Sequence, residues 1–135
     1  MSRYFLILLF IACASGEVPT QAPQEVALAS EFRLAPGQAR RVAGNGLTVR
    51  FVRLVSDSRC PESVSCIWEG DGELEVELNL GEERSLARLH THGGPQHPKQ
   101  TLFSVYRVRL VELNPAPANP PRPESEYVAT LVVDR

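Results

Sequence analysis

Two cysteines, Cys60 and Cys66, lie six positions apart in a polar stretch, and the single tryptophan, Trp68, follows two residues later. Such a pair can form a thiol redox centre, a structural zinc site or a disulfide. Redox cysteines are normally separated by two residues at a helix N-terminus, which does not match this turn. A structural zinc site needs about four ligands, and the histidines lie in one later segment. The spacing therefore favours a disulfide across a short loop, which would shape the turn while adding only about 2 kcal/mol of stability.

All three histidines also fall in one short segment, at His90, His92 and His97. A strand that continued to His92 would place His90 and His92 on the same side, and the Gly-Gly-Pro turn that follows could return His97 toward them. Three imidazoles can bind Cu(II) or Zn(II). A copper or zinc site is therefore one hypothesis for this segment, and a solvated polar loop without any cofactor is the other.

The stretch around the cysteines offers a candidate binding surface made of Asp57, Arg59, Trp68 and Glu69. Trp68 is most simply a core residue packed near the disulfide, and its alternative role is an exposed aromatic anchor for a partner. The spacing of the acidic residues matches no dedicated calcium loop. We expect these residues to form a solvated acidic rim, in which a carboxylate pairs with Arg59.

The sequence contains no recognisable catalytic motif, since both a G-x-S-x-G stretch and a glycine-rich phosphate loop are missing. A small hydrolase would require one of the histidines to meet a serine and an acid in space. The formal net charge of −2 gives no electrostatic case for nucleic acid, which usually calls for a clustered basic face. We therefore predict a protein that is not an enzyme and does not bind nucleic acid.

The N-terminus, MSRYFLILLFIAC, has the pattern of a targeting segment, with Arg3 followed by an apolar run from Tyr4 to Ala12. The run is shorter than the ~20 apolar residues that a membrane-spanning helix needs. Its end, FIAC, resembles the lipobox of bacterial lipoproteins. That resemblance implies that residues 1–12 are a signal peptide and that Cys13 carries a lipid anchor to the membrane. Ala14 after this cysteine favours the outer membrane, facing the periplasm, in a cell with two membranes.

With Cys13 assigned to the lipid, Cys60 and Cys66 remain as a pair in a compartment that permits disulfides. Residues 13–30 after the signal peptide are small, polar and rich in proline, so we interpret them as the lipidated cysteine and a flexible tether. Residues 31–135 are then the folded domain.

The elements that must position the candidate residues are predicted to be β-strands. In Gly72 to Leu80 apolar and polar residues alternate without a break, as expected for a strand with one buried face. A second strand begins after the Asn45-Gly46 turn signal and loses its alternation near Val52 and Arg53, where we expect a bulge. Further strands are predicted at residues 32–35, 39–43, 84–90, 101–113 and 127–134.

Turn signals interrupt the chain about every ten residues, and this spacing is typical of a β-sandwich or β-barrel. We therefore predict an all-β fold, a single antiparallel β-sandwich of Ig-like or jelly-roll-like type with about 7–8 strands. The proline-rich residues 114–123 are expected to form an exposed, polyproline-like crossover between the last two strands.

The stretch DSRCPESVSCIWEG resembles a motif of small uncharacterised bacterial lipoproteins and exported proteins, D-S-R-C-P followed by C-x-W-x-G. The resemblance implies an envelope location and an all-β fold, and it carries no activity. Glu69 stands where that motif has alanine, which makes the turn more acidic. The favoured hypothesis is a lipid-anchored binding or scaffolding module whose partner is an envelope protein or a cell-wall component. The alternative is a periplasmic copper or zinc protein that uses His90, His92 and His97.

Overall fold

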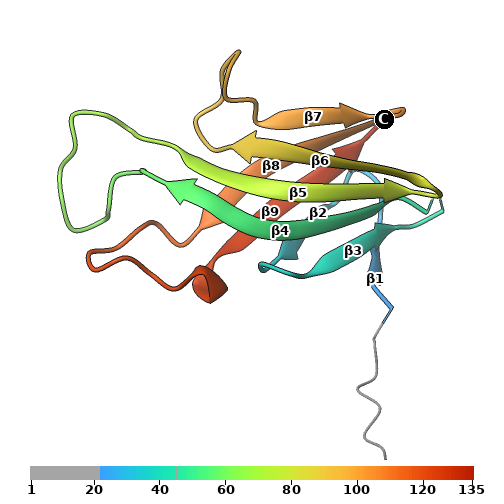
Figure 1. Cartoon of the computed structure of the whole chain (residues 1–135), viewed down its shortest axis with the longest axis horizontal. Helices are drawn as coiled ribbons and strands as arrows, with labels where there is room; N and C mark the ends of the chain where they lie inside the picture. Colours follow the sequence, from blue (N-terminus) through green and yellow to red (C-terminus); the bar gives the residue numbers. More distant parts are fainter. Residues whose placement is uncertain (1–21, 45) are drawn as a thin grey trace, which may run out of the picture.

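The computed structural model describes residues 22–44 and 46–135, and it consists of two β-sheets packed face to face (Figure 1). One sheet has the strand order β1-β3-β4-β5-β6 and the other β2-β9-β8-β7. The strands are β1 (Gln24–Val26), β2 (Glu31–Leu34), β3 (Ala39–Val42), β4 (Thr48–Asp57), β5 (Gly72–Leu80), β6 (Glu83–His90), β7 (Gln100–Phe103), β8 (Tyr106–Asn114) and β9 (Val128–Asp134). The predicted antiparallel β-sandwich is confirmed, with one parallel pair, β1 and β3, at a sheet edge.

The core lies between the sheets and follows the predicted alternation. Leu74, Val76 and Leu78 of β5 are fully buried, and Val49 and Phe51 of β4 lie opposite two of them in register. The other sheet contributes apolar side chains of the same kind, among them Leu34, Val108, Leu110, Leu131 and Val133. Burying these side chains is the main source of stability, at about 25 cal/mol per Å² of apolar surface.

The predicted bulge is confirmed, because the β4–β5 register shifts between Phe51 and Arg53. The single strand predicted over 101–113 is wrong, since β7 and β8 form a hairpin that turns at Ser104 and Val105. Neither turn residue is glycine or proline, so the sequence lacks the usual signal for a turn here. Ser104 adopts a φ of 55°. Strand β1 lies inside the segment assigned to the tether, so the sheet begins before Glu31.

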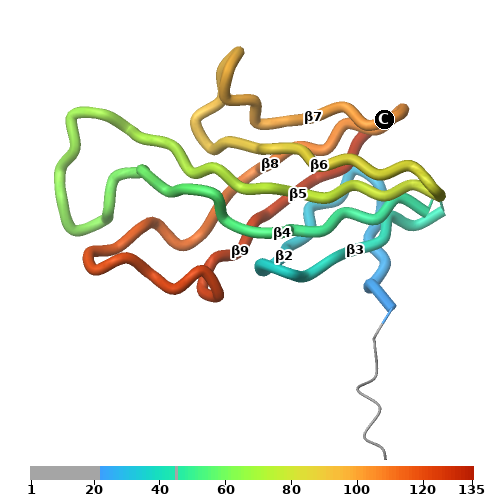
Figure 2. Tube along the Cα trace, in the orientation of Figure 1, coloured from blue at the N-terminus to red at the C-terminus, as the bar shows by residue number. Residues whose placement is uncertain are grey.

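Three long connections meet at one end of the sandwich (Figures 1 and 2). They are the clasp loop (residues 58–71) between β4 and β5, the histidine loop (residues 91–99) between β6 and β7, and the proline-rich loop (residues 115–127) between β8 and β9. The predicted crossover is wrong, because β8 and β9 pair directly as antiparallel neighbours. The proline-rich loop ends in a short 3-10 helix, Glu124–Glu126.

Residues 1–12 and Cys13, for which a signal peptide and a lipid anchor are predicted, lie outside the described residues. Over the ranges 22–44 and 46–135, no helix has the length and apolar character needed to cross a membrane.

Candidate functional site

The clasp loop is closed by the predicted disulfide between Cys60 and Cys66, whose Cα atoms lie 5.8 Å apart. Backbone hydrogen bonds extend the β4–β5 ladder into the base of the loop. The amide of Ser58 donates to the carbonyl of Asp71 at 2.8 Å, and the amide of Cys60 donates to the carbonyl of Glu69 at 3.3 Å. The disulfide and this ladder together hold the loop in one shape.

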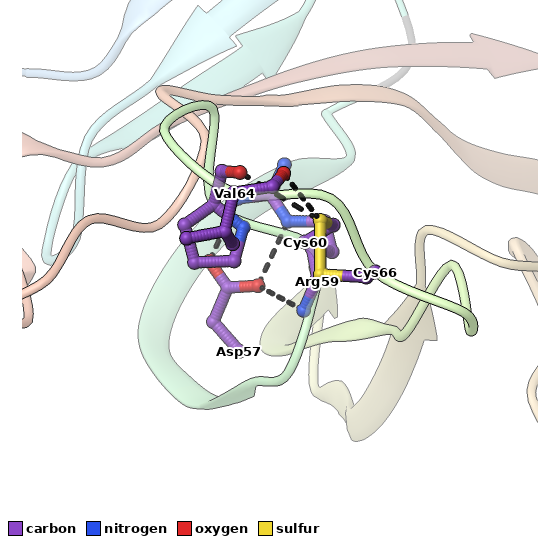
Figure 3. The surroundings of a disulfide bond; sticks show 6 residues. Asp57, Arg59, Cys60, Val64 and Cys66 are labelled. Carbon is purple, nitrogen blue, oxygen red and sulfur yellow. Dashed lines mark hydrogen bonds and ion pairs between the residues drawn. A yellow bond between two sulfur atoms is a disulfide. The ribbon is translucent and has the colours of Figure 1, made fainter.

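Asp57 and Arg59 also support the loop from below (Figure 3). The guanidinium of Arg59 donates to both carboxylate oxygens of Asp57 at 2.8 Å. It also donates to the carbonyl of Leu113 in β8 and to that of Pro115 in the proline-rich loop. The hydrogen bond to Asp57 raises the pKa of Arg59 although burial works against the charge. Because the side chain of Asp57 is only 5% exposed, its carboxylate has a structural role and does not form part of the predicted binding surface, whereas Arg59 is 18% exposed and lines a cleft beside Trp68.

Trp68 does not lie in the core. Its exposed fraction is 82% and that of its neighbour Ile67 is 94%, so the simpler interpretation of Trp68 as a core residue is wrong. The end of the core beneath the loop is occupied instead by Leu113 and by Tyr127, both of which are almost completely buried. Glu69, next to Trp68, is exposed as well. Two large apolar side chains therefore project from a loop that is held rigidly at its base.

Tyr127 shares the buried region with Asp57 and Arg59. Burial raises the pKa of the Tyr127 phenol, and the hydrogen bond to the Asp57 carboxylate raises it further. The unfolded chain therefore loses this proton first, near pH ~10, and stability contributed by Tyr127 falls as the pH rises from there through the folded-state pKa.

We expect the stability advantage of the wild-type protein over Tyr127→Phe to be constant below about pH 9 and to shrink above about pH 10. Urea unfolding of both proteins between neutral and alkaline pH measures this difference. Parallel pH profiles would show that the phenol keeps the same pKa in the folded and unfolded chains.

A second group of polar side chains lies beside the clasp loop and consists of Asp71, His90 and His97. Asp71 ends the clasp loop, and one of its carboxylate oxygens lies 2.6 Å from Nδ1 of His90, the last residue of β6. The rings of His90 and His97 meet edge to face with their centroids 4.9 Å apart. His97 is returned to this position because the amide of His90 donates to the carbonyl of Pro98 at 3.0 Å, which closes the histidine loop.

The carboxylate of Asp71 makes most of the hydrogen bonds in this group. Its other carboxylate oxygen accepts hydrogen bonds from the amides of Thr91 and His92 and from the Thr91 hydroxyl, at 3.0–3.1 Å. Partial burial alone would raise the pKa of Asp71, but the hydrogen bonds from His92, His90 and Thr91 outweigh it and lower the pKa below its usual value. The residue is therefore a carboxylate at neutral pH.

The predicted set of three histidines is only partly brought together. Strand β6 ends at His90, so His92 leaves the strand direction, is exposed and lies 3.4 Å from Glu69. Asp71, which was not among the predicted site residues, takes its place in the group. The β5–β6 register decides this position, because the pairing of Glu73 with His90 brings the preceding residue, Asp71, alongside His90.

The acid and the histidine of a hydrolase site do meet here, but the neighbouring hydroxyls are engaged elsewhere. The Thr91 hydroxyl bonds to Asp71 and accepts from the amide of Gly72, and the Ser58 hydroxyl bonds to the backbone of Asp71. Neither hydroxyl is held by an imidazole base, so this geometry does not activate a nucleophile.

Two clefts flank the exposed tryptophan. The larger, of about 550 Å³, is bounded by the clasp, histidine and proline-rich loops and is lined by Arg59, Ile67, Trp68, His92 and Ala116 among others. The smaller, of about 260 Å³, is lined by Trp68, Glu69, Asp71 and His97 among others. Trp68 therefore lines both clefts; the larger cleft also contains the disulfide cysteines, the smaller one contains Asp71 and His97, and His92 lines both.

Comparison of the chain with family models, with curated proteins and with solved structures finds no match. The resemblance to small bacterial lipoproteins therefore stays a prediction from the motif alone.

Proposed function

We propose that the chain is a lipid-anchored binding module of the bacterial envelope, which presents the clasp loop to an envelope protein. The observation that carries this proposal is the pair of adjacent exposed side chains, Ile67 and Trp68, on a disulfide-closed loop. In this proposal Cys13 attaches the chain to the outer membrane, and the sandwich holds its loop end toward the periplasm.

Three features of the loop support recognition of a protein. Tryptophan is enriched among the residues that dominate binding energy at interfaces, because it buries a large apolar area with few rotatable bonds. The cleft of about 550 Å³ beside Trp68 can accept an apolar side chain of a partner. The disulfide and the Arg59 contacts order the loop before binding, which reduces the entropy lost on association.

The proposal is tested by site-specific photo-crosslinking of the full chain in bacterial cells. A photoreactive amino acid is placed at Ile67 in one protein and, as a matched control, at Leu102 in another. Leu102 is 73% exposed and lies on β7, away from the clasp loop. We expect Ile67 to give a defined protein adduct and Leu102 to give none.

Trp68→Ala should reduce the yield of the Ile67 adduct by about 10-fold or more, since removing a central aromatic anchor typically costs ~2 kcal/mol of binding energy. The same cells test the anchor, because Cys13→Ser should move the chain from the membrane fraction to the soluble fraction. Identical adducts from both positions, or none from Ile67, would contradict binding through the clasp loop.

A further inference from the structure

We propose that Asp71, His90 and His97 form a binding site for one divalent transition-metal ion of the zinc or copper class. One ligand atom from each residue lies within 4.8 Å of the other two. Bonds of about 2.0–2.1 Å to a tetrahedral ion would separate neighbouring ligand atoms by about 3.4 Å, so binding requires only small shifts. If Nδ1 of His90 is the ligand atom, the ion replaces the 2.6 Å hydrogen bond between His90 and Asp71, and this pair opens slightly. Neither Ile67 nor Trp68 is a ligand, so this site is independent of the function proposed above.

Two of the three ligands are already positioned. His90 is only 7% exposed and belongs to the β5–β6 pairing, and four hydrogen bonds hold the carboxylate of Asp71. His97 lies on the exposed histidine loop and is the ligand that can move inward. Because Asp71 and His90 are already held in place and only His97 must be ordered, binding of the ion loses less conformational entropy.

The types of ligand select the class of ion. Two imidazole nitrogens and one carboxylate oxygen suit zinc and copper, whereas calcium and magnesium prefer sites made of oxygen alone. The thiols that would favour a softer ion are absent here, because Cys60 and Cys66 are bonded to each other. His92 lines the same cleft, but it is not one of the three grouped ligands, since its imidazole lies 3.4 Å from Glu69.

The site is closed by protein on one side and open on the other. Asp71 and His97 line the cleft of about 260 Å³, which leaves room for a water molecule or an external group as a further ligand. Glu69 also lines this cleft, and no lysine or arginine is among its lining residues. The local charge therefore favours a cation.

The test uses the full chain, purified without chelator in mild detergent. Zinc chloride and copper sulfate are added separately, and the bound metal is counted by native mass spectrometry and its affinity measured by calorimetry. We expect one ion per chain. His97→Ala should weaken binding by at least about 10-fold, because it removes a ligand while leaving the buried part of the fold intact.

His92→Ala is the matched control, since it removes an exposed histidine of the same loop that is not a ligand. Its metal affinity should equal that of the wild-type protein. Thermal unfolding of both metal-free variants verifies that neither has lost its fold. The proposal is overturned if no ion binds, if His97→Ala binds as tightly as the wild type, or if His92→Ala weakens binding as much as His97→Ala does.

Discussion

Replacing Gly70 with alanine is expected to lower the free energy of unfolding by about 3–4 kcal/mol. Gly70 has a φ of 71°, and a β-carbon built on it would lie 1.9 Å from the carbonyl oxygen of Ser58. That oxygen belongs to the backbone, so it cannot rotate away as a flexible side chain would. The left-handed conformation costs an alanine roughly 1–2 kcal/mol, and separating the two strands of the loop base loses further hydrogen bonds of ~1 kcal/mol each.

Gly81→Ala provides a matched control for this effect. Gly81 also has a positive φ, of 60°, but a β-carbon there would meet no atom within 4 Å. It should therefore lose only the conformational part, about 1–2 kcal/mol. Urea unfolding of the two variants separates the clash from the backbone strain. Equal losses in both would show that the base of the clasp loop shifts without cost and that the loop is less rigid than its hydrogen bonds indicate.

Replacing Arg59 with methionine is expected to cost about 3–5 kcal/mol of stability, in the range observed when one partner of a buried ion pair is removed. The substitution leaves the carboxylate of Asp57 without its cation at a position where only 5% of the side chain is exposed. It also removes the donors to the carbonyls of Leu113 and Pro115, which tie the clasp loop to β8 and to the proline-rich loop.

Arg53→Met is the corresponding control in an exposed ion pair. Arg53 lies 3.2 Å from Glu75, but its side chain is 48% exposed, so we expect a loss below about 1 kcal/mol. Adding Asp57→Asn to Arg59→Met should recover part of the lost stability, because the unpaired charge is then gone. Similar losses for Arg59→Met and Arg53→Met in thermal or urea unfolding would rule out the structural role assigned to Arg59.

Much of the site could be located from sequence, but the roles of its residues could not. The disulfide followed from the spacing of Cys60 and Cys66, and the pairing of an acidic residue with Arg59 was expected. Whether that pair is buried depends on Leu113 and Pro115, which lie more than fifty residues away along the chain. The exposure of Trp68 was unpredictable for the same reason, since other side chains fill the end of the core.

The sequence by itself determined most of the strands, their buried faces and the all-β class, because alternation with a period of two is a local property of an extended chain. It did not predict the β7–β8 hairpin, because Ser104 and Val105 make the turn without glycine or proline. Only the tertiary structure decided that Asp71 joins His90 and His97 and that His92 does not. That choice depends on strand register and loop closure, which are set by contacts between distant segments rather than by neighbouring residues.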